Sequence, residues 1–171
     1  ARVEAAAGRQ LADVAALAQR AVDRPRNLGF ALSGTTLPGK SAPSFTLGAG
    51  EIEMGMGIHG EPGIWRDKLK PADTLADEML DRLLAEAPPD GKRVALLVNS
   101  LGATPLEELY ILYRRLAAQL TAKGYAVVLP LVGRYTTSME MAGASVTISF
   151  LDDELELLLQ APADCPFWMV K

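Results

Sequence analysis

A run of five apolar residues, 94–98, constrains the fold more than any other part of the chain. An uninterrupted apolar run of this length is typical of a central strand that is covered on both faces. A helix start follows, because Thr104 fits an N-cap, Pro105 the first helical position and Glu107 the third residue after the cap. Residues 125–132 form a second apolar run, so the middle of the chain predicts a strand, a helix and a strand in succession. The buried face of this helix is expected to carry Leu106, Leu109, Leu112, Tyr113 and Leu116.

The flanking segments extend this unit into one α/β domain. Apolar residues at helical spacing predict further helices over residues 10–22 and about 74–87. Alternation or short apolar runs predict strands at residues 28–32, 51–56 and 144–151. The strands near residue 59 and near the C-terminus are expected to be antiparallel, so the fold class is α/β, a single domain with a mixed β-sheet flanked by helices. Periodicity leaves residues 152–159 open as helix or strand, residues 138–142 fit a short helix, and residues 162–166 are expected to be irregular.

The composition excludes several classes of partner. Lys and Arg number 17 against 21 Asp and Glu, and no basic cluster marks a surface for nucleic acid or for an anionic membrane. The single cysteine, Cys165, has no partner for an internal disulfide and no second ligand for a zinc site. Charged residues interrupt the apolar segment 1–22, which is therefore neither a signal peptide nor a membrane span. A cytoplasmic location is expected, with no metal and no cofactor bound by this chain.

The only histidine, His59, lies in a segment crowded with glycine, residues 55–63. Glycines on both sides allow positive φ and let a ligand approach the imidazole closely, and Glu61-Pro62-Gly63 has the sequence of a tight turn. A lone histidine is more often a surface or hydrogen-bonded core residue than a catalytic one. A neutral imidazole is nonetheless a nucleophile that can add to a ketone or aldehyde to give a hemiaminal. A hydrolase with His59 as general base is disfavoured, because no Ser or Cys nucleophile motif accompanies it.

Two other segments are candidate ligand sites. Residues 99–102 follow a strand and precede a helix, where open α/β sheets bind ligands, but they lack both glycine-rich nucleotide motifs. A capped helix start is the preferred interpretation there. Glu51, Glu53 and Glu61 could suggest a carboxylate pair or a magnesium site. Alternation puts Glu51 and Glu53 together on the solvated face of a strand, so both are expected to be surface residues.

Two long motifs, residues 57–63 and 98–110, closely resemble the C-terminal half of the substrate-binding subunit of dihydroxyacetone kinase. The resemblance extends over the whole chain and implies that His59 binds the substrate ketone covalently as a hemiaminal. The substrate is then dihydroxyacetone or a similar short ketose. We further expect backbone N–H groups around Gly57 and Gly60 to hold the oxygen of the adduct.

The same resemblance implies what lies outside these residues. Residues 1–171 correspond to the family's second domain, and the preceding N-terminal domain would supply an aspartate and a second histidine for acid and base catalysis. The phosphoryl donor, ATP-Mg or a phosphocarrier protein, belongs to a separate helical domain or subunit, so the isolated chain is expected to be inactive. A homo-oligomer is expected. The alternative is a non-catalytic ligand sensor or coactivator with the same fold.

Overall fold

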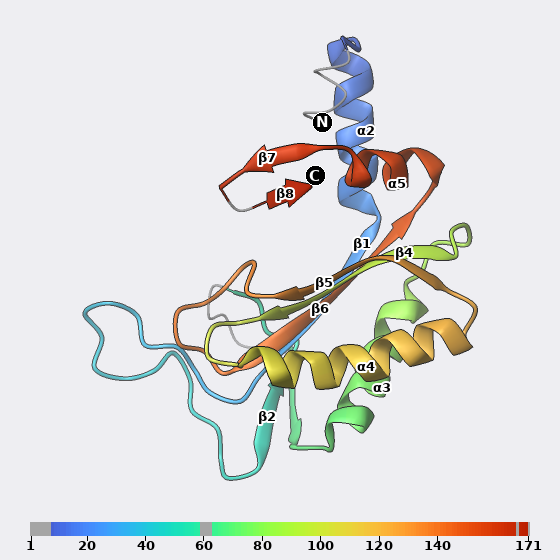
Figure 1. Cartoon of the computed structure of the whole chain (residues 1–171). Helices are drawn as coiled ribbons and strands as arrows, with labels where there is room; N and C mark the ends of the chain where they lie inside the picture. The colour runs from blue at the N-terminus through green and yellow to red at the C-terminus, as the bar shows by residue number, and fades with distance from the viewer. Residues whose placement is uncertain (1–7, 59–62, 167, 171) are drawn as a thin grey trace.

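The computed structural model describes residues 8–58, 63–166 and 168–170, and these residues build one mixed sheet with helices on both sides (Figure 1). The six strands lie in the order β3-β2-β1-β6-β4-β5. Among the described strand pairs of this sheet, β4 and β5 are parallel and the others are antiparallel. The predicted fold class is confirmed. The strands are β1 (Pro25–Ala31), β2 (Glu51–Met54), β3 (Trp65–Lys68), β4 (Arg93–Ser100), β5 (Ala126–Gly133) and β6 (Gly143–Leu151).

The helices and one hairpin complete the described chain. They are α2 (Leu11–Asp23), α3 (Ala72–Ala85), α4 (Leu106–Ala122), α5 (Asp153–Gln160) and the hairpin of β7 (Ala163–Cys165) and β8 (Trp168–Val170). None of the helices in this part of the chain has the length and apolar character needed to cross a membrane.

The unit of β4, α4 and β5 confirms the predicted strand, helix and strand, but the helix start differs in detail. Pro105 occupies the cap position and α4 begins at Leu106. The Thr104 hydroxyl instead accepts a hydrogen bond from the Gly143 backbone N–H, at 2.8 Å, and thereby ties the connection to β6. Leu106 was predicted to be buried and is 47% exposed, whereas Leu109, the next residue of the predicted face, is fully buried.

The main hydrophobic core lies between one face of the sheet and the pair α3 and α4. Val94, Leu96 and Val98 of β4 are fully buried there. On the opposite face, α2 and α5 cover one end of the sheet, where Ala95 packs with Leu17, Leu151 and Leu155 (Figure 1). Leu97 is only half-buried. The prediction that β4 is covered on both faces is therefore right for one face and wrong for the middle of the other.

Three smaller expectations are corrected or decided by the structure. Residues 138–142 form a turn and a parallel bridge between Met141 and Gly102 rather than a helix. Residues 153–160 are helical, because the Asp152 carboxylate caps the helix by accepting a hydrogen bond from the Leu155 N–H at 2.8 Å. The C-terminal tail forms the hairpin of β7 and β8 and is not irregular.

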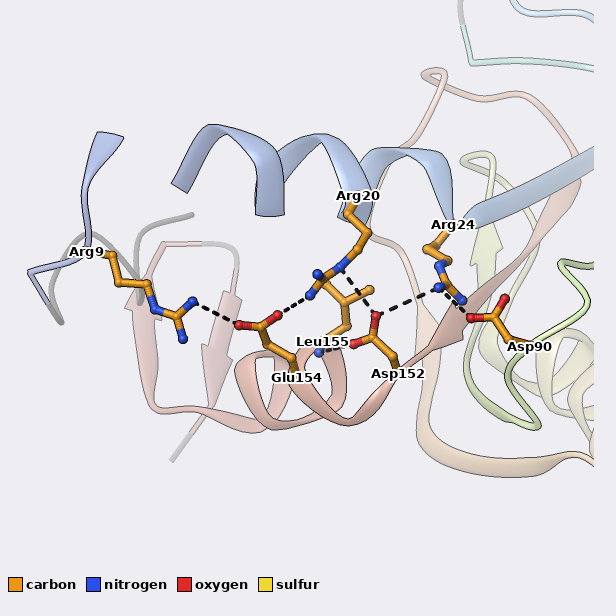
Figure 2. A network of polar contacts seen from close by, with 7 residues as sticks. All are labelled: Arg9, Arg20, Arg24, Asp90, Asp152, Glu154 and Leu155. Atoms are coloured by element: carbon orange, nitrogen blue, oxygen red, sulfur yellow. Dashed lines mark hydrogen bonds and ion pairs between the residues drawn. The ribbon is translucent and has the colours of Figure 1, made fainter. Parts of the chain in front are cut away.

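Ion pairs join α2 to the start of α5 (Figure 2). Arg20 pairs with Glu154 and, at 3.3 Å, with Asp152, while Arg9 reaches Glu154 at 3.0 Å. The Arg20 guanidinium lowers the pKa of Glu154 by donating a hydrogen bond to it. Arg24 Nη2 lies 3.9 Å from Asp152 Oδ2 and extends the network to the C-terminal end of α2. The network orients α2 against α5, where Leu17 and Leu155 supply the apolar contact.

Candidate functional site

Residues 55–63 are named here the histidine loop. Its described residues Gly57 and Ile58 lie on the sheet face that α3 and α4 do not cover, beside Leu97 and Asn99 of β4. Gly55 has a φ of 81°, which turns the chain away from the strand. The N–H groups of Gly55 and Met56 both donate to the Gly29 carbonyl oxygen, at 2.7 and 3.2 Å. Met56 is buried in a small cluster, and Ile58 packs against this cluster. The first part of the histidine loop is therefore anchored to the sheet.

The other end of the histidine loop returns to the same strand. The Gly63 N–H donates to Glu53 Oε1 at 3.0 Å, and the Ile64 N–H donates to the Met54 carbonyl oxygen at 2.7 Å. Arg66 Nε lies 2.7 Å from Glu53 Oε2. Glu53 is only 5% exposed, so its prediction as a surface residue is wrong. The cause is the loop itself, since its returning end covers the strand face on which Glu53 lies.

His59 and Gly60 lie outside the described residues, as does Glu61, so their predicted roles stay predictions. Gly57 is described, is exposed and lies next to Ile58 on the wall of a hollow. His59 follows Ile58 directly in the sequence. The described part of the chain therefore ends on the wall of this hollow, one residue before His59.

The hollow lies on the open face of the sheet and has a volume of about 340 Å³. Its described lining residues come from β1, β4 and β6 and from the loops beside them, and none of them carries an ionisable side chain. We call it the polar hollow because five of its ten described lining residues carry side-chain amides or hydroxyls, beside the apolar Met56, Ile58, Leu97 and Leu101. These polar residues are Asn27, Asn99, Thr136, Ser145 and Thr147.

Hydrogen bonds among these side chains set the shape of the polar hollow. Asn27 Nδ2 donates to Thr147 Oγ1 at 2.7 Å, which links β1 to β6. Asn99 Nδ2 donates to the Thr136 carbonyl oxygen at 2.7 Å and to Ser145 Oγ at 3.2 Å. Asn99 Oδ1 accepts from the N–H groups of Tyr135 and Thr136, at 2.8 and 3.0 Å. Asn99 therefore holds the wall formed by the loop after β5.

Asn99 and the next residue, Ser100, have different roles. Ser100 is fully buried, its hydroxyl donates to the Thr104 carbonyl oxygen at 2.8 Å, and it accepts from the Gly102 N–H at 3.2 Å. These bonds favour the interpretation of the strand-to-helix connection as a capped helix start rather than as a ligand site. Asn99, in contrast, faces the polar hollow. No group of three potential metal ligands occurs in the part of the chain that the structure describes.

The arrangement can bind hydroxyl groups and has no acid or base of its own among the described lining residues. Serine and threonine hydroxyls both donate and accept hydrogen bonds, and amide side chains do the same through separate atoms. A small polyhydroxylated molecule matches such a lining. No described lining residue of the polar hollow supplies a general acid or base for proton transfer.

Sequence reasoning located the histidine loop but missed most of the polar hollow. Of its five polar lining residues, only Asn99 lies in a segment that the sequence indicated as a candidate ligand site, whereas Ser145 and Thr147 lie on one face of β6. The available signal was the uncharged polar character of that strand face, which suits neither a packed core nor an ordinary charged surface. Residues 27 and 147 are 120 positions apart, and only the pairing of β1 with β6 brings them together.

Comparison with known proteins identifies the family. Residues 1–167 match the Dak1 domain, and the chain belongs to this family. It is 46% identical over 167 residues to L-erythrulose kinase of Pectobacterium atrosepticum, which covers 95% of this chain and 28% of that protein. It is 44% identical over 167 residues to the dihydroxyacetone-binding subunit DhaK of PTS-dependent dihydroxyacetone kinase 2 of Listeria innocua. That match covers 97% of this chain and 50% of the subunit.

A solved structure shares the fold. The dihydroxyacetone kinase operon co-activator Dha-DhaQ superimposes with a TM-score of 0.83 at 32% sequence identity, over 90% of this chain and 48% of that one. The present chain thus spans at most about half the length of these three proteins. The family resemblance seen in the two sequence motifs is confirmed, and the relatives named as kinases and the co-activator contain the same domain.

Proposed function

We propose that this domain binds a short hydroxyketone, dihydroxyacetone or a close relative, covalently through His59 as part of a kinase assembly. One observation carries the proposal: in a chain of the Dak1 family, the Gly-Ile-His-Gly-Glu-Pro-Gly segment begins on the wall of a polar hollow and is anchored at both ends. Two fixed ends restrict where the histidine can be. The hollow supplies the hydroxyl-binding surface beside it.

The covalent step requires only the imidazole and the ketone. The lone pair of the unprotonated ring nitrogen of His59 attacks the carbonyl carbon, and the C=O π bond opens onto oxygen. The oxygen takes up one proton and the other ring nitrogen gives one up, so the imidazole N–H adds across the double bond. Backbone N–H groups of Gly57 and Gly60 donate to the oxygen while its charge develops. An alcohol without a carbonyl group cannot form this adduct, which gives selectivity.

Phosphoryl transfer needs groups beyond this domain. The described lining of the polar hollow has no acid or base, so we assign proton transfer to an N-terminal domain that precedes residues 1–171 in the complete protein. The phosphoryl donor, ATP-Mg or a phosphocarrier protein, is assigned to a separate helical domain or subunit, and no cofactor to this chain. We expect the isolated domain to be inactive, and the complete protein to be a cytoplasmic homo-oligomer.

A second candidate is a ligand sensor that keeps the ketone site and does not transfer phosphate. The observation that favours it is the similarity to the co-activator Dha-DhaQ, at a TM-score of 0.83. Both candidate functions use His59 to bind the ketone, so an experiment distinguishes them only at the phosphoryl-transfer step. Turnover in the reconstituted assembly supports the kinase; ligand binding without turnover in the presence of either donor supports the sensor.

The test of the covalent site uses dihydroxyacetone labelled with carbon-13 at the carbonyl position. In the full-length protein we expect a new signal of a tetrahedral carbon and a matching mass increase of the protein. In the variants H59N and H59A the signal is expected to vanish, because neither side chain offers an imidazole nitrogen. An unchanged tetrahedral signal in both variants contradicts the covalent role of His59.

A further inference from the structure

A buried carboxylate joins the two strands from which the histidine loop emerges. Glu53 is the third residue of β2 and lies opposite Arg66 of β3 in the sheet register. Its side chain is almost fully buried, whereas half of the Arg66 side chain is exposed. Glu51, two residues earlier on the same strand face, is exposed. The burial of Glu53 is therefore specific to its position beneath the returning loop.

Burying a carboxylate costs free energy unless its oxygens accept hydrogen bonds. Both oxygens of Glu53 do so: Oε2 accepts from Arg66 Nε at 2.7 Å and Oε1 from the Gly63 N–H at 3.0 Å. A bond from a backbone N–H to a charged oxygen is stronger than one between neutral groups. Glu53 thus holds the backbone of the loop at the first described residue after His59.

The loop approaches this carboxylate closely. A Cβ atom at position 63 would lie 2.4 Å from the Met54 carbonyl oxygen and 2.7 Å from Glu53 Cγ, so glycine is required there by contact. On the other side of the histidine, Ile58 packs against the buried Met56 and its neighbours. The described residues on the two sides of His59 are therefore held in different ways, Ile58 by apolar packing and Gly63 by a hydrogen bond to a carboxylate.

We propose that Glu53 is a positioning residue for His59, which it serves by fixing Gly63. This inference rests on the proposed function, because it assigns to the carboxylate the task of holding the imidazole at the polar hollow. Addition of a nucleophile to a carbonyl depends steeply on geometry, and a displacement of about 1 Å costs roughly 100-fold in rate. A loop released at Gly63 loses that geometry while the sheet stays intact.

The test compares Glu53→Asp and Glu53→Gln with the matched controls Glu51→Asp and Glu51→Gln. Aspartate keeps the charge but withdraws the carboxylate by one methylene from Gly63; glutamine keeps the length but presents an N–H₂ group to donors. In the full-length protein, with dihydroxyacetone labelled at its carbonyl carbon, we expect the rate of adduct formation to fall about 10- to 100-fold in both Glu53 variants. We expect no change in the Glu51 controls, and faster amide hydrogen exchange at Gly63 in the Glu53 variants only.

The outcomes separate this inference from the proposed function. No adduct in the wild-type protein would overturn the function and the positioning role together. A normal wild-type adduct with equally fast formation in both Glu53 variants would overturn the positioning role alone. Rates are taken per folded molecule, from the fraction folded in a parallel denaturation curve. A loss of stability without a change in the rate of adduct formation would show that Glu53 has a structural role only. If Glu53→Asp does not fold, the rate measured for Glu53→Gln decides between the two roles.

Discussion

Gly29 and Met56 meet backbone to backbone at the start of the histidine loop. A Cβ atom on residue 29 would lie only 2.2 Å from the Met56 carbonyl oxygen. The same glycine accepts hydrogen bonds from the N–H groups of Gly55 and Met56. A residue of β1 thereby sets how closely the loop before His59 lies against the sheet.

The variant G29A is expected to push the histidine loop away from the sheet. Because the backbone fixes the position of the new Cβ atom and its contact is a backbone carbonyl oxygen, no side-chain rotation relieves the clash. We expect a loss of about 1–3 kcal/mol in the free energy of unfolding. Adduct formation at His59 should weaken as well. Urea denaturation and the labelled-ketone signal measure the two effects.

The control for this variant is G39A. Gly39 has a φ of 79° in an exposed loop with no atom within 4 Å of its added Cβ, so its replacement introduces backbone strain without a clash. We expect about 1 kcal/mol of destabilisation and normal ketone binding. Equal binding losses in G29A and G39A would show that the contact with Met56 is unimportant.

Removal of the Asn99 side chain is expected to loosen the wall of the polar hollow. The residue is 2% exposed, and N99A leaves the N–H groups of Tyr135 and Thr136 without the acceptor they use. We expect a loss of about 2 kcal/mol in unfolding free energy, from unsatisfied polar groups. Amide hydrogen exchange at residues 135 and 136 should accelerate.

Asn27 provides the comparison within the same hollow. Its side chain bonds Thr147 but is exposed, so N27A should change the unfolding free energy by no more than about 0.5 kcal/mol. If amide hydrogen exchange at residues 135 and 136 is as slow in N99A as in N27A, the role given to Asn99 is contradicted.

The pair of Arg115 and Asp77 predicts a pH dependence of stability. Arg115 Nε lies 2.8 Å from Asp77 Oδ1, and its hydrogen bonds lower the pKa of Asp77 while partial burial opposes the shift. A depressed carboxyl pKa stabilises the folded state above the unfolded pKa of about 3.9, and this contribution is lost as the pH falls through the folded pKa. The pair joins α3 to α4, so its loss weakens their packing.

The expected result is a Tm difference between the wild type and D77N that is largest near neutral pH and shrinks below about pH 4. The double variant D77N/R115Q completes a cycle that isolates the coupling between the two side chains. A Tm difference that stays constant from pH 7 to pH 3 would show that the ion pair does not carry the effect.

Local sequence patterns predicted the elements well where local chemistry decides them. The apolar run 94–98 and the cap residues after it gave the order of strand, helix and strand, because hydrophobic periodicity and helix capping act within a few residues. The exposure of Leu106 was missed for the opposite reason, since the burial of a residue in the first turn of a helix depends on which distant segments pack there. The helix at 153–160 is also favoured locally, by the Asp152 cap, which hydrophobic periodicity alone does not reveal.

The sequence by itself determined the mixed α/β class and singled out His59 through its glycine neighbours and its family motif. Only the tertiary structure decided what surrounds the histidine loop. Alternation along β2 places Glu53 on the face opposite the core, yet it does not reveal that residue 63 returns to cover that face. The polar hollow has the same origin, because hydrogen bonds such as that from Asn27 to Thr147 join positions far apart in the chain. Alternation along one strand specifies which face of the sheet each side chain lies on. Which residues it contacts on that face is decided by the tertiary fold.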